Sequence, residues 1–403
     1  MKQHLDSTAD LPDATIDIAL QTFAGDELHQ YLRRLNNTKP VTAVRFLGLP
    51  AWLITDYSTI LAAFRDEESF PPADIYKMFL EPLIGQTFQT RSGADHQFYR
   101  KMATPGFRVN AIKQHEESVL SKLVNEIIDS FSQRAGVDLV TAFTQRLPYL
   151  VITRLLGIPP EAEEKFFNWA GGILSFAKDP LNAQRCSDEM SRYLAPVLDE
   201  RRISPGDDII SDLLRAEVDG ERFSLEELFA TVKLMFSAGA ATTHDALGSL
   251  IWALQTTPGA WQRIIENPAE IPLAVDELLR FESPVAILPR TSSTISDCRI
   301  ADVTIPANSI VLLAIAAGNR DPKIFAEPDK FIIGRDCTKA LTFGTGQRRC
   351  PGLHLAKRQL QIAIKILIER LPNLHLLEPL ASAPLGTVMR GPRSLPIRLT
   401  QNI

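Results

Sequence analysis

The sequence predicts a mainly α-helical fold with small β-sheets, organised as a single domain over residues 1–403. Apolar residues recur at helical spacing over most of the chain, whereas alternation typical of strands is confined to short stretches. Hydrophobic residues make up 45% and charged residues 23% of the chain, which is typical of a globular protein with a large core. No internal repeat and no Gly/Ser-rich linker divides the sequence.

The elements follow from this periodicity in chain order. Residues 41–55 predict a β-hairpin, with Gly48-Leu49-Pro50 as its turn. Residues 298–313 predict a second short β region that turns at Ile305-Pro306-Ala307, and residues 394–399 predict a strand. Helices are predicted over residues 112–131, 147–156, 162–176, 187–202, 224–255, 260–266, 274–280 and 353–371.

Charge and cysteine usage exclude several classes of protein. The net charge of −5 argues against a nucleic-acid partner. No stretch reaches the roughly 18 apolar residues of a spanning helix, and no apolar run marks a signal peptide at the start. We therefore expect no membrane anchor and a cytoplasmic protein. The four cysteines show neither zinc spacing nor the pattern of a disulfide framework.

One cysteine lies in an unusual segment, because residues 343–352 read Phe-Gly-Thr-Gly-Gln-Arg-Arg-Cys-Pro-Gly. Glycine permits a positive φ and a close approach of the backbone to a ligand. A helical pattern begins just after Cys350, so its sulfur lies near a helix N-terminus that favours a thiolate. Arg348 and Arg349 add positive charge. A lone cysteine of this kind would be interpreted as a buried residue beside a glycine turn, but the pattern extends over ten residues.

The segment resembles the haem-binding signature of the cytochrome P-450 superfamily at every fixed position, and the resemblance extends from about residue 41 to residue 399. It implies a long central helix over the haem and a cysteine loop beneath it. It also implies haem b (iron protoporphyrin IX) with Cys350 as the iron ligand, whose thiolate favours O–O cleavage. The haem-binding residues implied within this loop and the following helix are Phe343, Gly344, Arg348, Cys350, Gly352 and Ala356.

Further motifs of the same family occur in the same order. Glu277 and Arg280 form a Glu-x-x-Arg pair on one helical face, which the resemblance makes a buried structural pair with Arg335 as a third member. Taken alone, this motif is more typical of a solvated surface pair. The resemblance also implies that four polar or basic side chains bind the haem propionates through charge-assisted hydrogen bonds, which are strong. These residues are His96, Arg100, Arg290 and Arg348.

The oxygen side is predicted on the largely apolar helix 234–254. Ala238 and Gly239 would let this helix pass closely over a porphyrin, and Thr242 can bond its own backbone and open a groove for O2. The stretch resembles the oxygen-activation motif of the family, in which Thr242 supports proton delivery. The acidic position of the motif is Ala241, so we hypothesise that Asp245 or a substrate group replaces the acid. Without the cysteine loop, the small residues would indicate a packing seam between helices.

If the protein is a monooxygenase, its electrons come from a separate protein, because the chain has no dinucleotide fingerprint, flavin motif or iron–sulfur spacing. We expect NAD(P)H electrons to arrive through a ferredoxin or flavodoxin with its reductase. A docking patch for this partner could contain Lys101, Arg108, Lys113, Arg349, Lys357 and Arg358. Resemblance places an apolar substrate pocket, suited to a hydrophobic molecule of modest size, at Phe236, Val285, Ala286, Ile287 and Leu288.

The favoured function is therefore a monomeric haem-thiolate monooxygenase that oxidises a hydrophobic molecule with O2. The first alternative is a haem-thiolate enzyme that needs no redox partner: a peroxide-driven oxygenase, a dehydratase or an isomerase. It stays open because Ala241 occupies the acidic position of the oxygen-activation motif. A haem-binding or recruiting protein without turnover is the second. Turnover with hydrogen peroxide compared with turnover in a ferredoxin system separates the first two functions.

Overall fold

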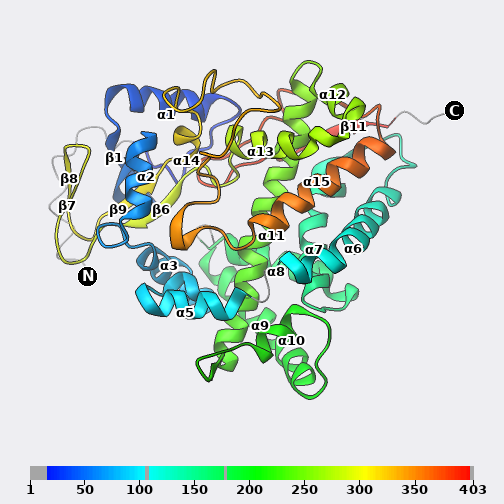
Figure 1. Cartoon of the computed structure of the whole chain (residues 1–403), viewed down its shortest axis with the longest axis horizontal. Helices are drawn as coiled ribbons and strands as arrows, with labels where there is room; N and C mark the ends of the chain where they lie inside the picture. Colours follow the sequence, from blue (N-terminus) through cyan, green and yellow to red (C-terminus); the bar gives the residue numbers. More distant parts are fainter. Residues whose placement is uncertain (1–15, 105–108, 177–178, 400–403) are drawn as a thin grey trace.

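The computed structural model describes residues 16–104, 109–176 and 179–399, and the side chains of these residues except 109–118, 160 and 163. Helices dominate the fold (Figure 1). In chain order the α-helices are α1 Glu27–Thr38, α2 Tyr57–Arg65, α3 Ala73–Phe79, α4 Glu81–Ile84, α5 Gly93–Ala103, α6 Val109–Asp129, α7 Arg146–Leu155, α8 Glu163–Leu174, α9 Pro180–Ile203, α10 Ile209–Arg215, α11 Leu225–Thr256, α12 Ala260–Glu266, α13 Ile271–Phe281, α14 Ile315–Gly318 and α15 Leu353–Arg370.

The largest sheet has four strands in the order β1-β2-β9-β6, and it lies on one side of the molecule, away from α6 and α15 (Figure 1). A second sheet has the order β10-β11-β3, and two hairpins, β4-β5 and β7-β8, complete the β-structure of the described residues. The strands are β1 Val41–Phe46, β2 Leu49–Ile54, β3 Gly136–Asp138, β4 Glu217–Val218, β5 Glu221–Arg222, β6 Leu288–Thr291, β7 Cys298–Ile300, β8 Val303–Ile305, β9 Ile310–Leu313, β10 His375–Leu376 and β11 Pro396–Arg398.

The predicted hairpin at residues 41–55 is confirmed, but the position of its turn was wrong. The register pairs Phe46 with Leu49, so the connection is the two-residue loop Leu47-Gly48, with φ angles of 51° and 78°. Two positive φ angles match the twist of a tight hairpin. Pro50 therefore lies within β2, opposite Arg45. The β region at 298–313 contains three strands, with a first turn at Ala301-Asp302 that the sequence reading missed.

The predicted helices are confirmed, with small shifts at their ends. The largest difference is at α9, which begins at Pro180 instead of residue 187. Asp179 accepts a hydrogen bond from the Asn182 N–H, and Pro180 occupies the first helical position, where its missing N–H costs nothing. None of the helices among the described residues combines the length and apolarity that crossing a bilayer requires.

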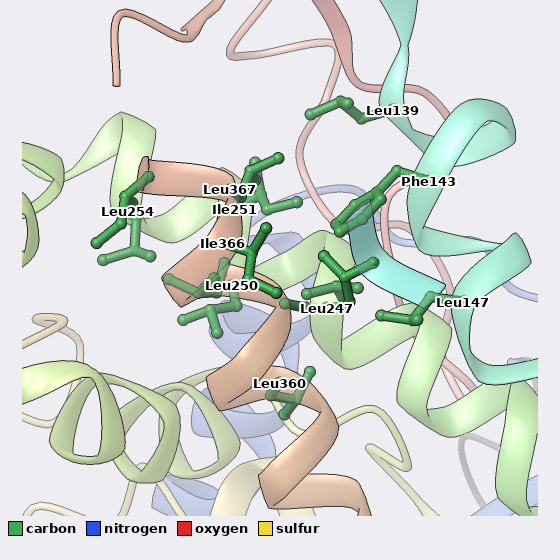
Figure 2. Close-up of a cluster of buried hydrophobic side chains, with 14 of the residues drawn as sticks. Leu139, Phe143, Leu147, Leu247, Leu250, Ile251, Leu254, Leu360, Ile366 and Leu367 are labelled. Atoms are coloured by element: carbon green, nitrogen blue, oxygen red, sulfur yellow. The ribbon is translucent and has the colours of Figure 1, made fainter. Parts of the chain in front are cut away.

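Helix α11 forms the centre of the core. Its capping box joins Ser224 and Glu227, which satisfies two N–H groups at its start. Leu247, Leu250 and Ile251 near its C-terminal end pack between α15 and the segment 139–147 (Figure 2). The N-terminal half packs instead on α8, which joins a second buried cluster. Because both halves of α11 are packed, the residues between them are held in place.

Candidate active site

The cysteine loop has the backbone that its glycines require. Gly344 and Gly346 both have a φ of 66°, a left-handed conformation that most side chains avoid. The Cys350 N–H donates to the Phe343 carbonyl at 2.9 Å, which closes the loop. Helix α15 then begins at Leu353, with Gly352 as its N-cap residue. The loop therefore presents the cysteine sulfur next to a helix N-terminus.

A cavity lies between this loop and α11. The cysteine loop contributes Phe343, Cys350 and Gly352, and α11 contributes Ala238, Gly239, Thr242 and Thr243 on the other side. Its remaining lining residues include Ile152, Leu155 and Leu156 from the region of α7, and Leu355, Ala356 and Gln359 from α15. The sequence expectation placed these two segments on opposite faces of one ligand, and in the structure both line one cavity.

Burial raises the pKa of the Cys350 thiol above its usual range, and the Gly352 N–H, Arg100 and Arg349 lower it by less. The sequence predicted that these neighbours favour the thiolate. They do lower the thiol pKa, as predicted, but burial raises it by more in the protein alone. A bound metal ion keeps a coordinating thiol deprotonated, so the thiolate form requires the metal as well as the helix.

Basic side chains converge beside the sulfur. Arg348 donates to the Arg91 carbonyl at 2.7 Å, and Arg290 donates to the Ala63 and Phe70 carbonyls at 3.1 Å and 3.0 Å. Burial lowers the pKa of His96 to about 4, with Arg348 and Arg100 acting in the same direction. Burial likewise lowers the pKa of Arg290 to about 10. Positive charge is therefore concentrated here without enough negative charge to balance it.

Two nitrogen atoms among these basic side chains lack a hydrogen-bond acceptor. His96 Nε2 and Arg290 Nε are buried and have no hydrogen-bond partner among the described residues. Buried polar groups are normally satisfied, so each orphaned nitrogen indicates a site for an anionic acceptor. The two carboxylates of a haem have the required charge and bonding capacity. The residues present therefore fit a haem whose iron is bound by Cys350 and whose propionates are bound by this cluster.

Tyr76 is a site residue that the sequence reading did not identify. Burial raises the pKa of its hydroxyl, which Arg290 and Arg348 lower and Cys350 raises, so the phenol lies within electrostatic range of all three. Glu67 is a second, since its carboxylate bonds Arg348 at 3.2 Å. No short motif surrounds either residue, and only their place on the folded chain reveals them.

Replacing Arg290 or Arg100 with alanine should speed haem loss without abolishing haem binding. Charge-assisted hydrogen bonds contribute about 1.5–3 kcal/mol each, which corresponds to about tenfold or more in the rate of loss. Transfer of haem to excess apomyoglobin, followed by absorbance, measures this rate. Arg215→Ala, which removes an exposed arginine paired with Asp212, is the matched control. An unchanged rate in both site variants would contradict the propionate assignment.

The Glu-x-x-Arg pair lies in the protein interior. Glu277 and Arg280 on α13 are both 0% exposed, and their two bonds are 2.8 Å and 2.7 Å long. Arg335 joins them through its Nε at 3.0 Å from Glu277. Arg280 also donates to the carbonyls of Asn319 and Pro328, both at 2.9 Å. The three charges thus tie α13 to the segment that leads to the cysteine loop.

The Asn-Arg-Asp-Pro turn at residues 319–322 contacts the same segment. Asn319 accepts from the Leu341 N–H at 2.7 Å and donates to Thr342 Oγ1 at 2.9 Å. Both contacts hold the chain immediately before Phe343. The next residue, Arg320, is buried among Glu282, Asp26 and Asp329. The turn is therefore structural, and it positions the start of the loop.

On the oxygen side, α11 is helical without interruption through residues 225–256. The Thr242 hydroxyl donates to the Ala238 carbonyl at 3.0 Å, and Thr243 donates to Gly239 at 2.9 Å. The predicted back-bond of Thr242 is therefore present, but the prediction that it opens the helix was wrong, because α11 stays regular around it. Gly239 also serves packing, because a Cβ there would lie 2.9 Å from Ile152 Cδ1.

Asp245 is buried in the same helix, one turn after Ala241. Its nearest charges are Arg393 at 3.8 Å and the His244 ring at 3.9 Å. Its Oδ1 has no hydrogen-bond partner among the described residues. Burial raises the pKa of this carboxyl to about 7, and Arg393 lowers it by less. Burial thus brings the pKa of Asp245 into the range that favours proton transfer at neutral pH, although the residue is not among those that line the cavity.

The predicted substrate residues are divided between pocket and core. Phe236 is 0% exposed and stacks on Phe166 with ring centroids 4.6 Å apart. It lies two positions from Ala238, on nearly the opposite face of α11, so its assignment to the pocket was wrong. Ala286 and Ile287 are also 0% exposed and belong to the core, so no ligand can touch them in this conformation. Val285 and Leu288 are half-buried and retain accessible surface.

The predicted basic patch is only partly described. Lys101 and Arg349 are exposed, whereas Lys357 is paired with Asp276 at 2.6 Å, which reduces its contribution. Arg358 is half-buried and has an interaction partner. Arg108 and the side chain of Lys113 lie outside the described residues. The two exposed cations flank the outer side of the cysteine loop, because Arg100 next to Lys101 bonds the Arg349 carbonyl.

A cysteine loop under a central helix, with unsatisfied basic groups beside it, is the arrangement expected of a haem-thiolate protein. A model of the cytochrome P450 family matches residues 176–374. Cytochrome P450 107B1 from Saccharopolyspora erythraea is 31% identical, over 97% of this chain and 99% of its own. The 6-deoxyerythronolide B hydroxylase of the same organism is 32% identical, over 89% and 92%.

The structural comparison agrees with these relatives. The cytochrome P450 PksS of the bacillaene polyketide synthase of Bacillus subtilis superposes with a TM-score of 0.87 and 28% identity, covering 94% of this chain and 98% of its own. The chain belongs to the cytochrome P450 family and has its fold. It is therefore an oxidoreductase of the monooxygenase class, and family membership implies haem, molecular oxygen and electrons from a partner.

Proposed function

We propose that the protein inserts one oxygen atom of O2 into a C–H bond of a small-to-medium hydrophobic molecule. The proposal is carried by the cavity that Cys350 and Thr242 line together with apolar side chains. Haem b, when bound through Cys350, supplies the activation of oxygen at this place. The 6-deoxyerythronolide B hydroxylase is named for a hydroxylation, which supports the reaction class.

The chain's own residues position and protect the reactants. We assign binding of the haem carboxylates to His96, Arg100, Arg290 and Arg348. Ile152, Leu155 and Met235 present apolar surface to the cavity, which excludes water and strengthens the electrostatic interactions inside it. The hydroxyl of Thr242 can hold a proton on this side, and Asp245 lies one turn further along the same helix.

Asp245 is proposed to supply the proton that Ala241 cannot. Asp245→Asn should lower the fraction of electrons recovered in product several-fold, with a matching rise in peroxide release, because Asn cannot give up a proton. Product formed per NAD(P)H consumed measures this. Arg393→Met, which removes the neighbouring cation and keeps the carboxyl, is the control for a purely structural effect. Full coupling in Asp245→Asn would leave the substrate as the remaining source of the acid.

The electron source is proposed to be NAD(P)H, through a ferredoxin or flavodoxin and its reductase. The exposed Lys101 and Arg349 would attract an acidic partner. The test compares product formation in a reconstituted ferredoxin system with formation driven by hydrogen peroxide alone. Higher turnover with the ferredoxin system is the expected result, whereas efficient turnover with peroxide alone would favour the partner-free alternative that Ala241 keeps open.

From the sequence we predict a single domain over residues 1–403, a monomer and a cytoplasmic location. Size-exclusion chromatography with light scattering measures the oligomeric state directly. A mass near 44.8 kDa is expected for the monomer.

A further inference from the structure

One wall of the cavity above Cys350 is formed by residues outside the haem motifs. Its side chains come from α7 and the residue after it, from the first turn of α10 and from α11. They are Ile152, Leu155, Leu156, Ile209 and Met235, and we call this set the apolar wall. The other lining residues come from the stretch 238–243, from the cysteine loop and from α15. The apolar wall therefore extends the cavity toward a part of the fold that the motifs do not explain.

The apolar wall adjoins the oxygen side of the site. A Cβ at Gly239 would lie 2.9 Å from Ile152 Cδ1, so the wall contacts α11 three residues before Thr242, on the same helical face. Among the described residues that line the cavity, none is Lys, Arg, His, Asp or Glu. The basic residues assigned to the haem carboxylates are thus outside this lining. A molecule at the apolar wall is therefore next to the helical turn that carries Thr242.

The ends of α7 and α10 are fixed to each other beside two of the wall residues. Arg201 on α9 donates through Nε to Asp208, the N-cap residue of α10, at 2.6 Å. The same guanidinium donates through Nη2 to the Gly157 carbonyl at 3.1 Å. Asp208 directly precedes Ile209, and Gly157 directly follows Leu156. Because the backbone is held at both places, the two side chains are restrained from moving inward to close the cavity.

The chemistry of the apolar wall selects the kind of molecule that it holds. The cavity has a volume of about 80 Å³, and close-packed protein interiors retain few voids larger than a water molecule. A buried water needs about two to four polar partners, whereas the wall offers aliphatic groups and the weakly accepting thioether of Met235. Apolar cavities stay dry and bind apolar molecules such as xenon. A small apolar gas therefore fits the wall better than water does.

We propose that the apolar wall is a binding site for O2, which holds the gas beside Thr242 before the gas is consumed. O2 is small and apolar, and family membership implies that the protein uses it. The inference rests on the proposed function, because stored O2 serves the protein only if O2 is its oxidant. It goes beyond that function by assigning O2 a site on the side chains of α7, α10 and α11.

Xenon is the probe for this site, because it is apolar and is directly visible in electron density. Crystals of the ferric holoprotein pressurised with xenon should show a xenon atom in contact with Leu156 and Ile209. Crystals of the same form without xenon should show no ordered water there. An ordered water hydrogen-bonded within the wall, or no xenon at the wall, would overturn the inference.

Rebinding of carbon monoxide to the reduced holoprotein after flash photolysis gives a second readout, which is independent of turnover. In the wild type, xenon should raise the fraction of carbon monoxide that rebinds without leaving the protein, because xenon occupies the place where the gas would otherwise reside. Ile209→Trp fills the wall with a larger side chain. It should slow entry of carbon monoxide from solvent several-fold and abolish the effect of xenon.

Ile271→Trp is the matched control. Ile271 is also a buried isoleucine at the first position of a helix, but it is not among the residues that line the cavity. This variant should keep the wild-type kinetics and the wild-type response to xenon. Equal slowing in both variants, or wild-type kinetics in folded Ile209→Trp, would contradict the assignment of the wall.

The xenon experiments on the wild type decide the inference even if Ile209→Trp does not fold. The spectrum of the reduced protein with carbon monoxide separates the inference from the proposed function. A red-shifted thiolate spectrum without xenon at the wall rejects the O2 site alone. A haem-loaded protein that lacks the thiolate spectrum rejects the proposed function, and the O2 site with it.

Discussion

The reduced wild-type protein treated with carbon monoxide should show a strongly red-shifted Soret band, and Cys350→His should lose it. A thiolate ligand donates electron density to the haem iron that an imidazole does not. The loop supports this role, because the Cys350 N–H is fixed to the Phe343 carbonyl at 2.9 Å and the sulfur lines the cavity beneath α11. Absorption spectra of the two purified proteins, with haem content measured separately, make the comparison.

Cys186→Ala is the control for this prediction, because Cys186 is a buried, free cysteine on α9. It should keep the wild-type spectrum. Retention of the red-shifted band by Cys350→His would reject Cys350 as the ligand. Fresh wild-type protein that binds haem yet gives an ordinary haem spectrum would reject thiolate ligation altogether.

Glu277→Gln should lower the free energy of unfolding by about 3–5 kcal/mol, the usual cost of breaking a buried ion pair. The substitution leaves Arg280, which is 0% exposed, and Arg335, which is 10% exposed, without their counter-ion. It also weakens the acceptor for the Ile332 N–H, which lies 2.9 Å from Glu277 Oε1. Urea unfolding of the apoprotein, followed by circular dichroism, measures the change.

The matched control for Glu277→Gln is Asp212→Asn. Asp212 and Arg215 also lie three residues apart on a helix, but their side chains are 37% and 56% exposed. Exposed pairs contribute about 1 kcal/mol or less. If both substitutions lowered the free energy of unfolding equally, burial of the Glu277–Arg280 pair would not be the source of the expected loss of stability. The Glu277→Gln holoprotein should also lose its red-shifted carbon monoxide spectrum more readily than the wild type. The reason is that Arg280, which Glu277 positions, bonds the Asn319 carbonyl, and Asn319 holds the chain that leads to the cysteine loop.

Local sequence was sufficient for features whose physics is local. The glycines at 344 and 346 indicate positive φ angles because other residues adopt them at a cost, and the structure has both. The helical periodicity of residues 224–255 is local as well, and α11 begins at Leu225, directly after its N-cap Ser224. The three-residue spacing of Glu277 and Arg280 places both on one helical face, where the structure pairs them.

Tertiary structure decided whatever depends on the neighbours of a side chain. An apolar residue such as Phe236 fits a pocket and a core equally well, and only the packing of α8 on α11 places it against Phe166. The thiol pKa of Cys350 depends on how much water its surroundings exclude, and that burial outweighs the nearby helix end. Tyr76 and Glu67 belong to the site through contacts across the chain that no spacing encodes.

The sequence by itself predicted the family and the order of the helices, and it identified Cys350 as the expected haem ligand, because these inferences rest on motifs and periodicities of residues within a few positions of one another. Tertiary structure alone decided which basic groups lack an acceptor and which apolar residues retain accessible surface. The reason is that solvation and charge balance are properties of a volume, which distant segments of the chain enclose together.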